Sequence, residues 1–186
     1  MRAFIVHRWD GKPNSDWYPW LKKELERKGF KVTIPKMPNT AEPEINAWVS
    51  HLAKVVGNVD KKTYFIGHSI GCQTIMRYIE TLSKNKKVGN LLFVAGWFKL
   101  ANLEDEDVEE IAKPWLTTPI DFSRVKEKTN KITVMLSEND PYNELNENKR
   151  LFEEKLNANV IITKNKGHFT DEDGITKLQE ILNLLP

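Results

Sequence analysis

The chain has 186 residues, about the size of one ordinary domain, and 40% of them are hydrophobic. With 9 Gly and 9 Pro, the composition is that of a globular protein and excludes a collagen-like or low-complexity one. Lys and Arg total 28 against 26 Asp and Glu, and the two signs are mixed along the chain, so no charge pattern indicates nucleic-acid binding. The apolar runs are far shorter than the roughly 20 residues that cross a bilayer. Cys72 is the single cysteine, which excludes an intramolecular disulfide, and we expect a cytoplasmic protein.

Short apolar runs rich in β-branched residues alternate with longer segments of helical period. The runs predict strands at residues 4–6, 30–35, 64–66, 91–95, 132–136 and 159–163. The periodic segments predict helices at residues 17–28, 45–56, 69–82, 145–156 and 175–185. This alternation predicts a single α/β domain over residues 1–186, a three-layer sandwich with a mostly parallel sheet of about six strands.

Residues 97–130 interrupt the alternation between two strands. The segment includes an acidic run, residues 104–110, followed by Pro114, Trp115 and Pro119. It is too long for a bare loop, so we expect one or two short helices there, which could form a minimal lid.

The third expected strand ends in Gly67-His68-Ser69-Ile70-Gly71, a G-x-S-x-G pattern placed between a strand and a helix. A nucleophile on so tight a turn adopts a strained backbone conformation, and its flanking positions must be small where strand and helix approach. Ser69 is the predicted nucleophile, and the alternative is an ordinary helix N-cap serine. The Ile70 amide would lie at the helix N-terminus, where it can stabilise an oxyanion.

A serine nucleophile needs a base, and the base needs an orienting acid. Residues 132–136 run into Ser137-Glu138-Asn139-Asp140-Pro141, and residues 160–163 run into a turn that holds His168. The order Ser69, Asp140, His168 is that of the α/β-hydrolases, and each residue follows a predicted strand. We expect His168 to be the general base and Asp140 its orienting acid, with Glu138 as the competitor for that role.

With these motifs the chain resembles the small α/β-hydrolases of the retinoblastoma-binding protein 9 and YdeN-like serine hydrolase family. The resemblance spans nearly the whole chain, and its further motifs are Asp16-Trp17-Tyr18-Pro19-Trp20-Leu21, Gly167-His168-Phe169 and Asp171-Glu172-Asp173-Gly174. It implies a compact α/β-hydrolase fold with a minimal lid, and serine hydrolase activity on ester-like bonds of a small molecule. No cofactor is expected, and no metal-binding motif is present in the sequence.

The chain departs from this family in two places. Many relatives carry His-Gly after the first strand, where this chain has His7-Arg8-Trp9-Asp10-Gly11. Arg8 replaces the small residue, and by position we expect the Trp9 amide to be the second oxyanion donor. The L-x-C-x-E motif associated with retinoblastoma binding is absent around Cys72, so that partner is not carried over.

Aromatic residues after the fourth strand lie where the site is expected. Trp97 and Phe98, together with Arg8, are the predicted substrate-pocket residues, whereas Trp115 is expected to cover the core. His7 and His68 are expected to be structural, and Cys72 to be a small core residue.

Three functions compete at this point. The first is a serine hydrolase that cleaves a small carboxylic ester, thioester or amide through an acyl-enzyme. The second is a non-catalytic binding module on a hydrolase fold. The third, a flavodoxin-like nucleotide binder, has no phosphate-binding loop to support it and leaves the Ser-Asp-His order unexplained.

Overall fold

The computed structural model describes residues 1–103 and 105–186, so Glu104, the first residue of the acidic run, lies outside the described residues. The strands are β1 (Arg2–Val6), β2 (Lys31–Thr33), β3 (Thr63–His68), β4 (Leu91–Val94), β5 (Ile132–Ser137) and β6 (Asn159–Thr163). The helices are α1 (Tyr18–Arg27), α2 (Ile45–Val56), α3 (Ile70–Thr81), α4 (Glu106–Thr117), α5 (Phe122–Lys128), α6 (Leu145–Leu156) and α7 (Gln179–Asn183). Within that part of the chain, every helix is too short or too polar to cross a membrane.

All strands belong to one sheet with the order β2-β1-β3-β4-β5-β6, and each neighbouring pair is parallel. The predicted α/β class is confirmed, and the sheet is parallel throughout rather than mostly so. The strand ends are in register: Val6 lies opposite Gly67, and His68 opposite Val94. The loops that leave the carboxyl ends of β1, β3, β4, β5 and β6 therefore meet at one edge of the sheet, where parallel α/β sheets place their sites.

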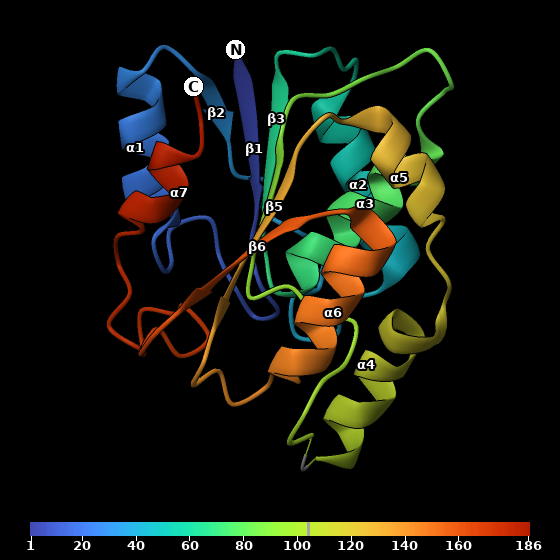
Figure 1. Cartoon of the computed structure of the whole chain (residues 1–186), viewed down its shortest axis with the longest axis vertical. Helices are drawn as coiled ribbons and strands as arrows, with labels where there is room; N and C mark the ends of the chain where they lie inside the picture. Colours follow the sequence, from blue (N-terminus) through green and yellow to red (C-terminus); the bar gives the residue numbers. More distant parts are fainter. Residues whose placement is uncertain (104) are drawn as a thin grey trace.

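Helices cover both faces of the sheet (Figure 1). Successive side chains of a strand point to opposite faces. Phe4 and Val6 of β1 accordingly pack in the core beneath α2, α3, α5 and α6, whereas Ala3 and Ile5 pack against α1 and α7. The buried residues of α1 and α2 repeat every three or four positions, which explains why these segments form amphipathic helices.

Two segments, residues 97–130 and the C-terminal helix, give different outcomes when their predicted helices are compared with the structure. Residues 97–130 contain two helices, α4 and α5, as their length suggests. The last helix is shorter than predicted, because α7 begins only at Gln179. Ile175 and Leu178 do pack against the core, but they reach it from the irregular segment that precedes the helix. Burial of spaced apolar residues produced a helix-like pattern where the backbone is not helical.

Candidate active site

Ser69 occupies a strained turn between β3 and α3. Its φ of 54° and ψ of −121° lie where L-residues are rarely found. A Cβ added to Gly67 would lie 2.7 Å from the Cys72 nitrogen, and one added to Gly71 would lie 2.3 Å from the Val6 oxygen. Both glycines of the motif are therefore sterically required, because helix and strands approach too closely for any side chain there.

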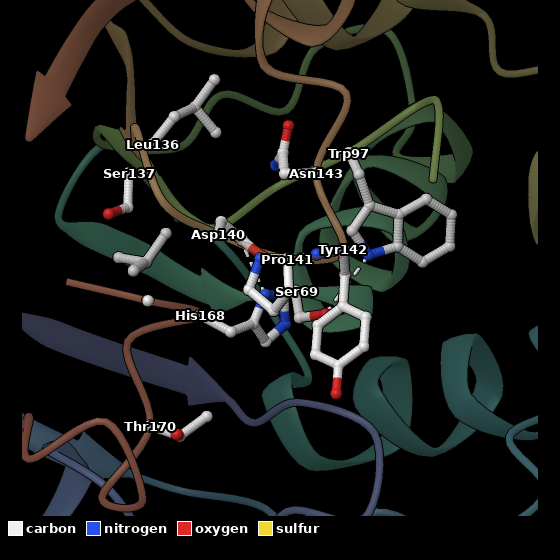
Figure 2. A network of polar contacts seen from close by, with 12 residues as sticks. Ser69, Trp97, Leu136, Ser137, Asp140, Pro141, Tyr142, Asn143, His168 and Thr170 are labelled. Atoms are coloured by element: carbon white, nitrogen blue, oxygen red, sulfur yellow. Dashed lines mark hydrogen bonds and ion pairs between the residues drawn. The ribbon is translucent and has the colours of Figure 1, made fainter. Parts of the chain in front are cut away.

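The Ser69 hydroxyl does not cap the helix that follows it. No side-chain capping bond is present at the N-terminus of α3. Instead the Trp97 indole N–H donates a hydrogen bond to Ser69 Oγ over 3.2 Å. Figure 2 shows Ser69 gathered with Trp97 and His168. Among the described residues no hydrogen bond joins Ser69 to His168, and such contacts are often long before substrate binds.

His168 and Asp140 form a close pair. The His168 Nδ1 and Asp140 Oδ2 lie 2.8 Å apart, and Tyr142 N–H donates to the other carboxylate oxygen over 3.0 Å. A carboxylate accepts, so Nδ1 carries the proton and Nε2 is left as the free basic nitrogen. Asp140 is buried, whereas Glu138, the competing acid, is exposed. The geometry favours Asp140.

The turns that carry Asp140 and His168 are fastened to each other by side chains. Ser137 Oγ accepts from the Lys166 N–H over 3.1 Å and donates to Asn139 Oδ1 over 2.8 Å. The same Asn139 oxygen accepts from the Gly167 N–H over 3.1 Å. These hydrogen bonds between the two turns fix the separation between Asp140 and His168.

Hydrogen bonds fix the orientation of the Arg8–Trp9 peptide in the loop after β1. His7 Nε2 accepts from the Met37 N–H, so its Nδ1–H donates to the Arg8 carbonyl over 2.8 Å. Gly11 N–H donates to the same carbonyl. Because the C=O and N–H of a trans peptide point in opposite directions, the Trp9 N–H is directed away from these groups.

Two backbone N–H groups near Ser69 are free to donate hydrogen bonds to a ligand oxygen. Within the described chain the Trp9 N–H has no acceptor, and Trp9 lines the same cavity as Ser69. Ile70 is the first residue of α3, so its N–H has no intrahelical partner. The helix dipole adds partial positive charge at that point.

The positive charge of the Arg8 side chain is paired with a buried carboxylate. Its Nε lies 3.0 Å from Asp16 Oδ2, and the Asp16 side chain is wholly buried. Asp16 also accepts from the Asp171 N–H over 2.9 Å. Burial alone would raise the pKa of Asp16, but the Asp171 N–H and the Arg8 guanidinium together lower it, so the pair stays ionised.

Tyr18 and His68 connect the loop after β1 to the loop that carries His168. The Arg8 N–H donates to the Tyr18 hydroxyl over 3.2 Å, and that hydroxyl lies 2.6 Å from His68 Nδ1. His68 Nε2 donates to the His168 carbonyl over 2.7 Å, which leaves Nδ1 as an acceptor for the tyrosine proton. Burial, together with His168, lowers the pKa of His68 to about 3, so its ring is neutral.

A cavity of about 460 Å³ opens beside Ser69. Ser69, Trp97 and His168 line it, together with Arg8 and Trp9. Asp10, from the loop after β1, and Tyr142, from the loop after β5, also line it. The remaining lining residues lie before and within α4: Leu100, Asn102, Leu103, Asp105 and Val108. The excursion after β4 therefore forms one wall of this cavity.

Phe98 does not line this cavity, contrary to the sequence prediction. Its ring packs against Phe152 at 4.5 Å and against Phe122 at 5.3 Å between ring centroids. Phe98 follows Trp97 directly and points to the other side, where these two rings surround it. Trp115 is buried in the core, as predicted, and its indole N–H donates to the Pro43 carbonyl.

A buried pair of asparagine side chains, which was not predicted from the sequence, supports the site. Asn148 Oδ1 accepts from the Phe98 and Lys99 N–H groups, and its amide donates to Asn143 Oδ1 over 2.8 Å. Asn143 in turn donates to the Gly96 carbonyl over 3.0 Å. The pair joins the Trp97 loop to the Asp140 loop. The only sequence signal is a polar residue on the apolar face of α6, at Asn148.

The described residues contain no cluster of three or more His, Cys, Asp or Glu side chains able to hold a metal ion. The polar groups around Ser69 are instead a hydroxyl, an imidazole–carboxylate pair and free N–H groups. These are the kinds of group that a serine nucleophile requires.

The serine hydrolase family matches residues 3–186 of the chain. The chain belongs to this family. YdeN of Bacillus subtilis is 27% identical over 185 residues, covering 99% of this chain and 94% of that protein. Serine hydrolase RBBP9 of Rattus norvegicus is 27% identical over 170 residues, covering 91% of this chain and 84% of that protein. The resemblance stated from the motifs is confirmed.

Solved structures show the same fold. The crystal structure of the B. subtilis ydeN gene product superposes with a TM-score of 0.89 at 24% identity, covering 99% of this chain and 96% of that one. A structure from the thaumarchaeon Nitrososphaera gargenis, described with carboxylesterases, gives a TM-score of 0.71 at 14% identity, covering 99% and 88% of the two chains. This serine hydrolase has the α/β-hydrolase fold predicted from its sequence.

Proposed function

We propose that this serine hydrolase cleaves a small carboxylic ester through an acyl-enzyme on Ser69. The observation that carries the proposal is the convergence, at one edge of the sheet, of a strained serine and an oriented histidine–carboxylate pair. Ser69 has its φ of 54°, and His168 lies 2.8 Å from Asp140. The carboxylesterase structure that shares the fold supports ester chemistry, and thioesters and amides are further substrates of the same mechanism.

Acylation begins when His168 Nε2 takes the Ser69 proton as Oγ attacks the carbonyl carbon. The new C–Oγ bond pushes the carbonyl electron pair onto oxygen, and the Ile70 and Trp9 N–H groups stabilise that oxyanion. Asp140 stabilises the imidazolium and keeps the ring in the required tautomer. When the carbonyl re-forms, the bond to the leaving alcohol breaks, and His168 gives the alcohol its proton.

Deacylation repeats these steps with water. His168 removes a proton from a water molecule that attacks the acyl carbon, and the oxyanion again lies against the two N–H groups. The C–Oγ bond then breaks, its electron pair stays on Oγ, and His168 returns the proton to Ser69. The acid is released and the resting enzyme is restored.

Cavity size and lining point to a short acyl group. Ligand pockets usually span roughly 300–1,000 Å³, and the cavity beside Ser69 has about 460 Å³. Trp9, Leu100, Leu103 and Val108 give it an apolar wall. We therefore expect p-nitrophenyl acetate and butyrate to be hydrolysed with higher kcat/KM than the dodecanoate ester.

Hydrolysis of p-nitrophenyl butyrate by purified variants tests the proposal. Ser69→Ala and His168→Ala are expected to lower kcat by about 10⁴-fold or more, and Asp140→Asn by about 10³- to 10⁴-fold. Ser50→Ala, an exposed serine on α2, is the matched control and should leave the rate unchanged. A folded wild-type protein that hydrolyses none of the esters, or a Ser69→Ala variant as active as the wild type, would favour the binding-module alternative.

A further inference from the structure

Trp97 makes a direct contact with the predicted nucleophile that a pocket-lining role does not require. We propose that Trp97 is a further catalytic residue, whose indole N–H stabilises negative charge on Ser69 Oγ as the acyl-enzyme forms and breaks down. This inference rests on the proposed acyl-enzyme mechanism. It adds a donor on the attacking oxygen itself, distinct from the Ile70 and Trp9 N–H groups, which face the carbonyl oxygen.

The contact involves the reacting atom. Trp97 Nε1 lies 3.2 Å from Ser69 Oγ, in a buried environment where Trp97 is 2% exposed and Ser69 6% exposed. An indole nitrogen only donates, whereas a serine oxygen has two lone pairs and a proton of its own. The Ser69 hydroxyl can therefore accept from Trp97 and still give its proton to His168.

Side-chain hydrogen bonds fix the backbone that carries the indole, from Gly96 to Lys99. Gln73 on α3 donates its amide N–H to the Trp97 carbonyl over 2.9 Å. Gly96, immediately before Trp97, accepts from Asn143 over 3.0 Å. The next N–H groups along the chain, those of Phe98 and Lys99, are held by Asn148. A donor fixed before the reaction needs no reorganisation when charge develops, which is what makes preorganised donors effective.

The chemistry gives this donor a defined role in both half-reactions. As His168 removes the Ser69 proton, Oγ gains negative character before the C–Oγ bond forms. When the acyl-enzyme is hydrolysed, the C–Oγ bond breaks and its electron pair stays on Oγ until His168 returns the proton. The indole N–H is retained throughout, so the proton balance of the reaction is unchanged. A donor to an oxygen that carries charge is worth more than one to a neutral hydroxyl.

The test compares two tryptophans that each make one indole hydrogen bond from a buried site. Trp97→Phe removes the N–H that faces Ser69 and keeps most of the ring. Trp115→Phe removes the N–H that donates to the Pro43 carbonyl, from a residue that is 1% exposed. Pre-steady-state hydrolysis of p-nitrophenyl acetate gives the acylation rate from the burst and the deacylation rate from the steady state.

We expect Trp97→Phe to lower both the acylation and the deacylation rate by about 10-fold, with a smaller change in KM, and Trp115→Phe to change neither rate by more than about 2-fold. Because either variant can lose stability, circular dichroism and thermal unfolding are measured for both. If Trp97→Phe does not fold, Trp97→His, which places a smaller ring N–H there, is measured in its place and is expected to retain more activity than Trp97→Ala.

An unchanged rate in the folded Trp97→Phe variant would overturn the proposal. A faster rate would also overturn it, since it would mean that the indole draws Ser69 away from His168 in the resting enzyme. Failure of the proposed function itself has a different signature, because the folded wild type would then hydrolyse none of the esters, or ester hydrolysis would survive in Ser69→Ala.

Discussion

The Tyr18 hydroxyl contacts both the loop after β1, at the Arg8 N–H, and the His68 ring, so its removal gives a quantitative test. Tyr18→Phe keeps the ring but leaves His68 Nδ1 and the Arg8 N–H without their partner. An unsatisfied buried polar group costs about 1–3 kcal/mol. His68 is fully buried and Arg8 is only partly so, which gives an expected loss of about 2–4 kcal/mol of unfolding free energy.

That loss corresponds to a decrease in Tm of roughly 4–16 °C for a chain of this length. Urea unfolding followed by far-UV circular dichroism measures the free energy directly. Tyr78→Phe is the matched control. Tyr78 is 3% exposed, and in the described structure its hydroxyl has no protein partner, so its removal should change stability by less than about 0.5 kcal/mol. Equal losses in the two variants would refute the reasoning that the Tyr18 hydrogen bonds, rather than ring packing, hold the two loops together.

Three further outcomes are expected from the described contacts. Stability should fall as the pH is lowered below 6.5, because the unfolded His68 takes up a proton that the buried ring, with its pKa of about 3, does not. The slope of unfolding free energy against pH should reach at most about 1.4 kcal/mol per pH unit for this group, and His68→Gln should flatten it. Gly71→Ala should lower the Tm far more than Gly89→Ala, because the new Cβ meets backbone at the first position and only the Tyr64 ring at the second. Asp16→Asn should slow ester hydrolysis several-fold without unfolding the protein, since Arg8 loses its ionic partner while the Asp171 N–H keeps an acceptor oxygen; equal kcat values would contradict this.

The sequence was sufficient for the sheet, for most helices and for the convergence of Ser69, Asp140 and His168. Apolar periodicity depends on burial, and burial is what the strands and amphipathic helices have in common. The bounds of α2 and α6, and of β6, follow it to the residue. The same signal failed at the C-terminus, where Ile175 is partly buried from an irregular segment. Periodicity reports which residues are buried and does not report the backbone that buries them.

Contacts between distant segments could not be predicted in this way. Tyr18 and His68 are 50 positions apart, and His68 and the His168 carbonyl are 100 apart. No local pattern specifies such pairs. Arg8 is a second example. The sequence shows only that it replaces the small residue of many relatives, whereas in the structure its guanidinium lies against Asp16 and the Trp9 N–H has no acceptor in the described chain.

Covalent labelling with a fluorophosphonate probe shows whether Ser69 is an activated nucleophile, because the probe requires an activated serine and oxyanion donors but not the natural substrate. We expect a single adduct that mass spectrometry places on Ser69. Labelling should be absent in Ser69→Ala and reduced by about 10³-fold or more in His168→Ala. A folded wild-type protein that stays unlabelled, or an adduct on any other residue, would contradict the claim that Ser69 is the nucleophile.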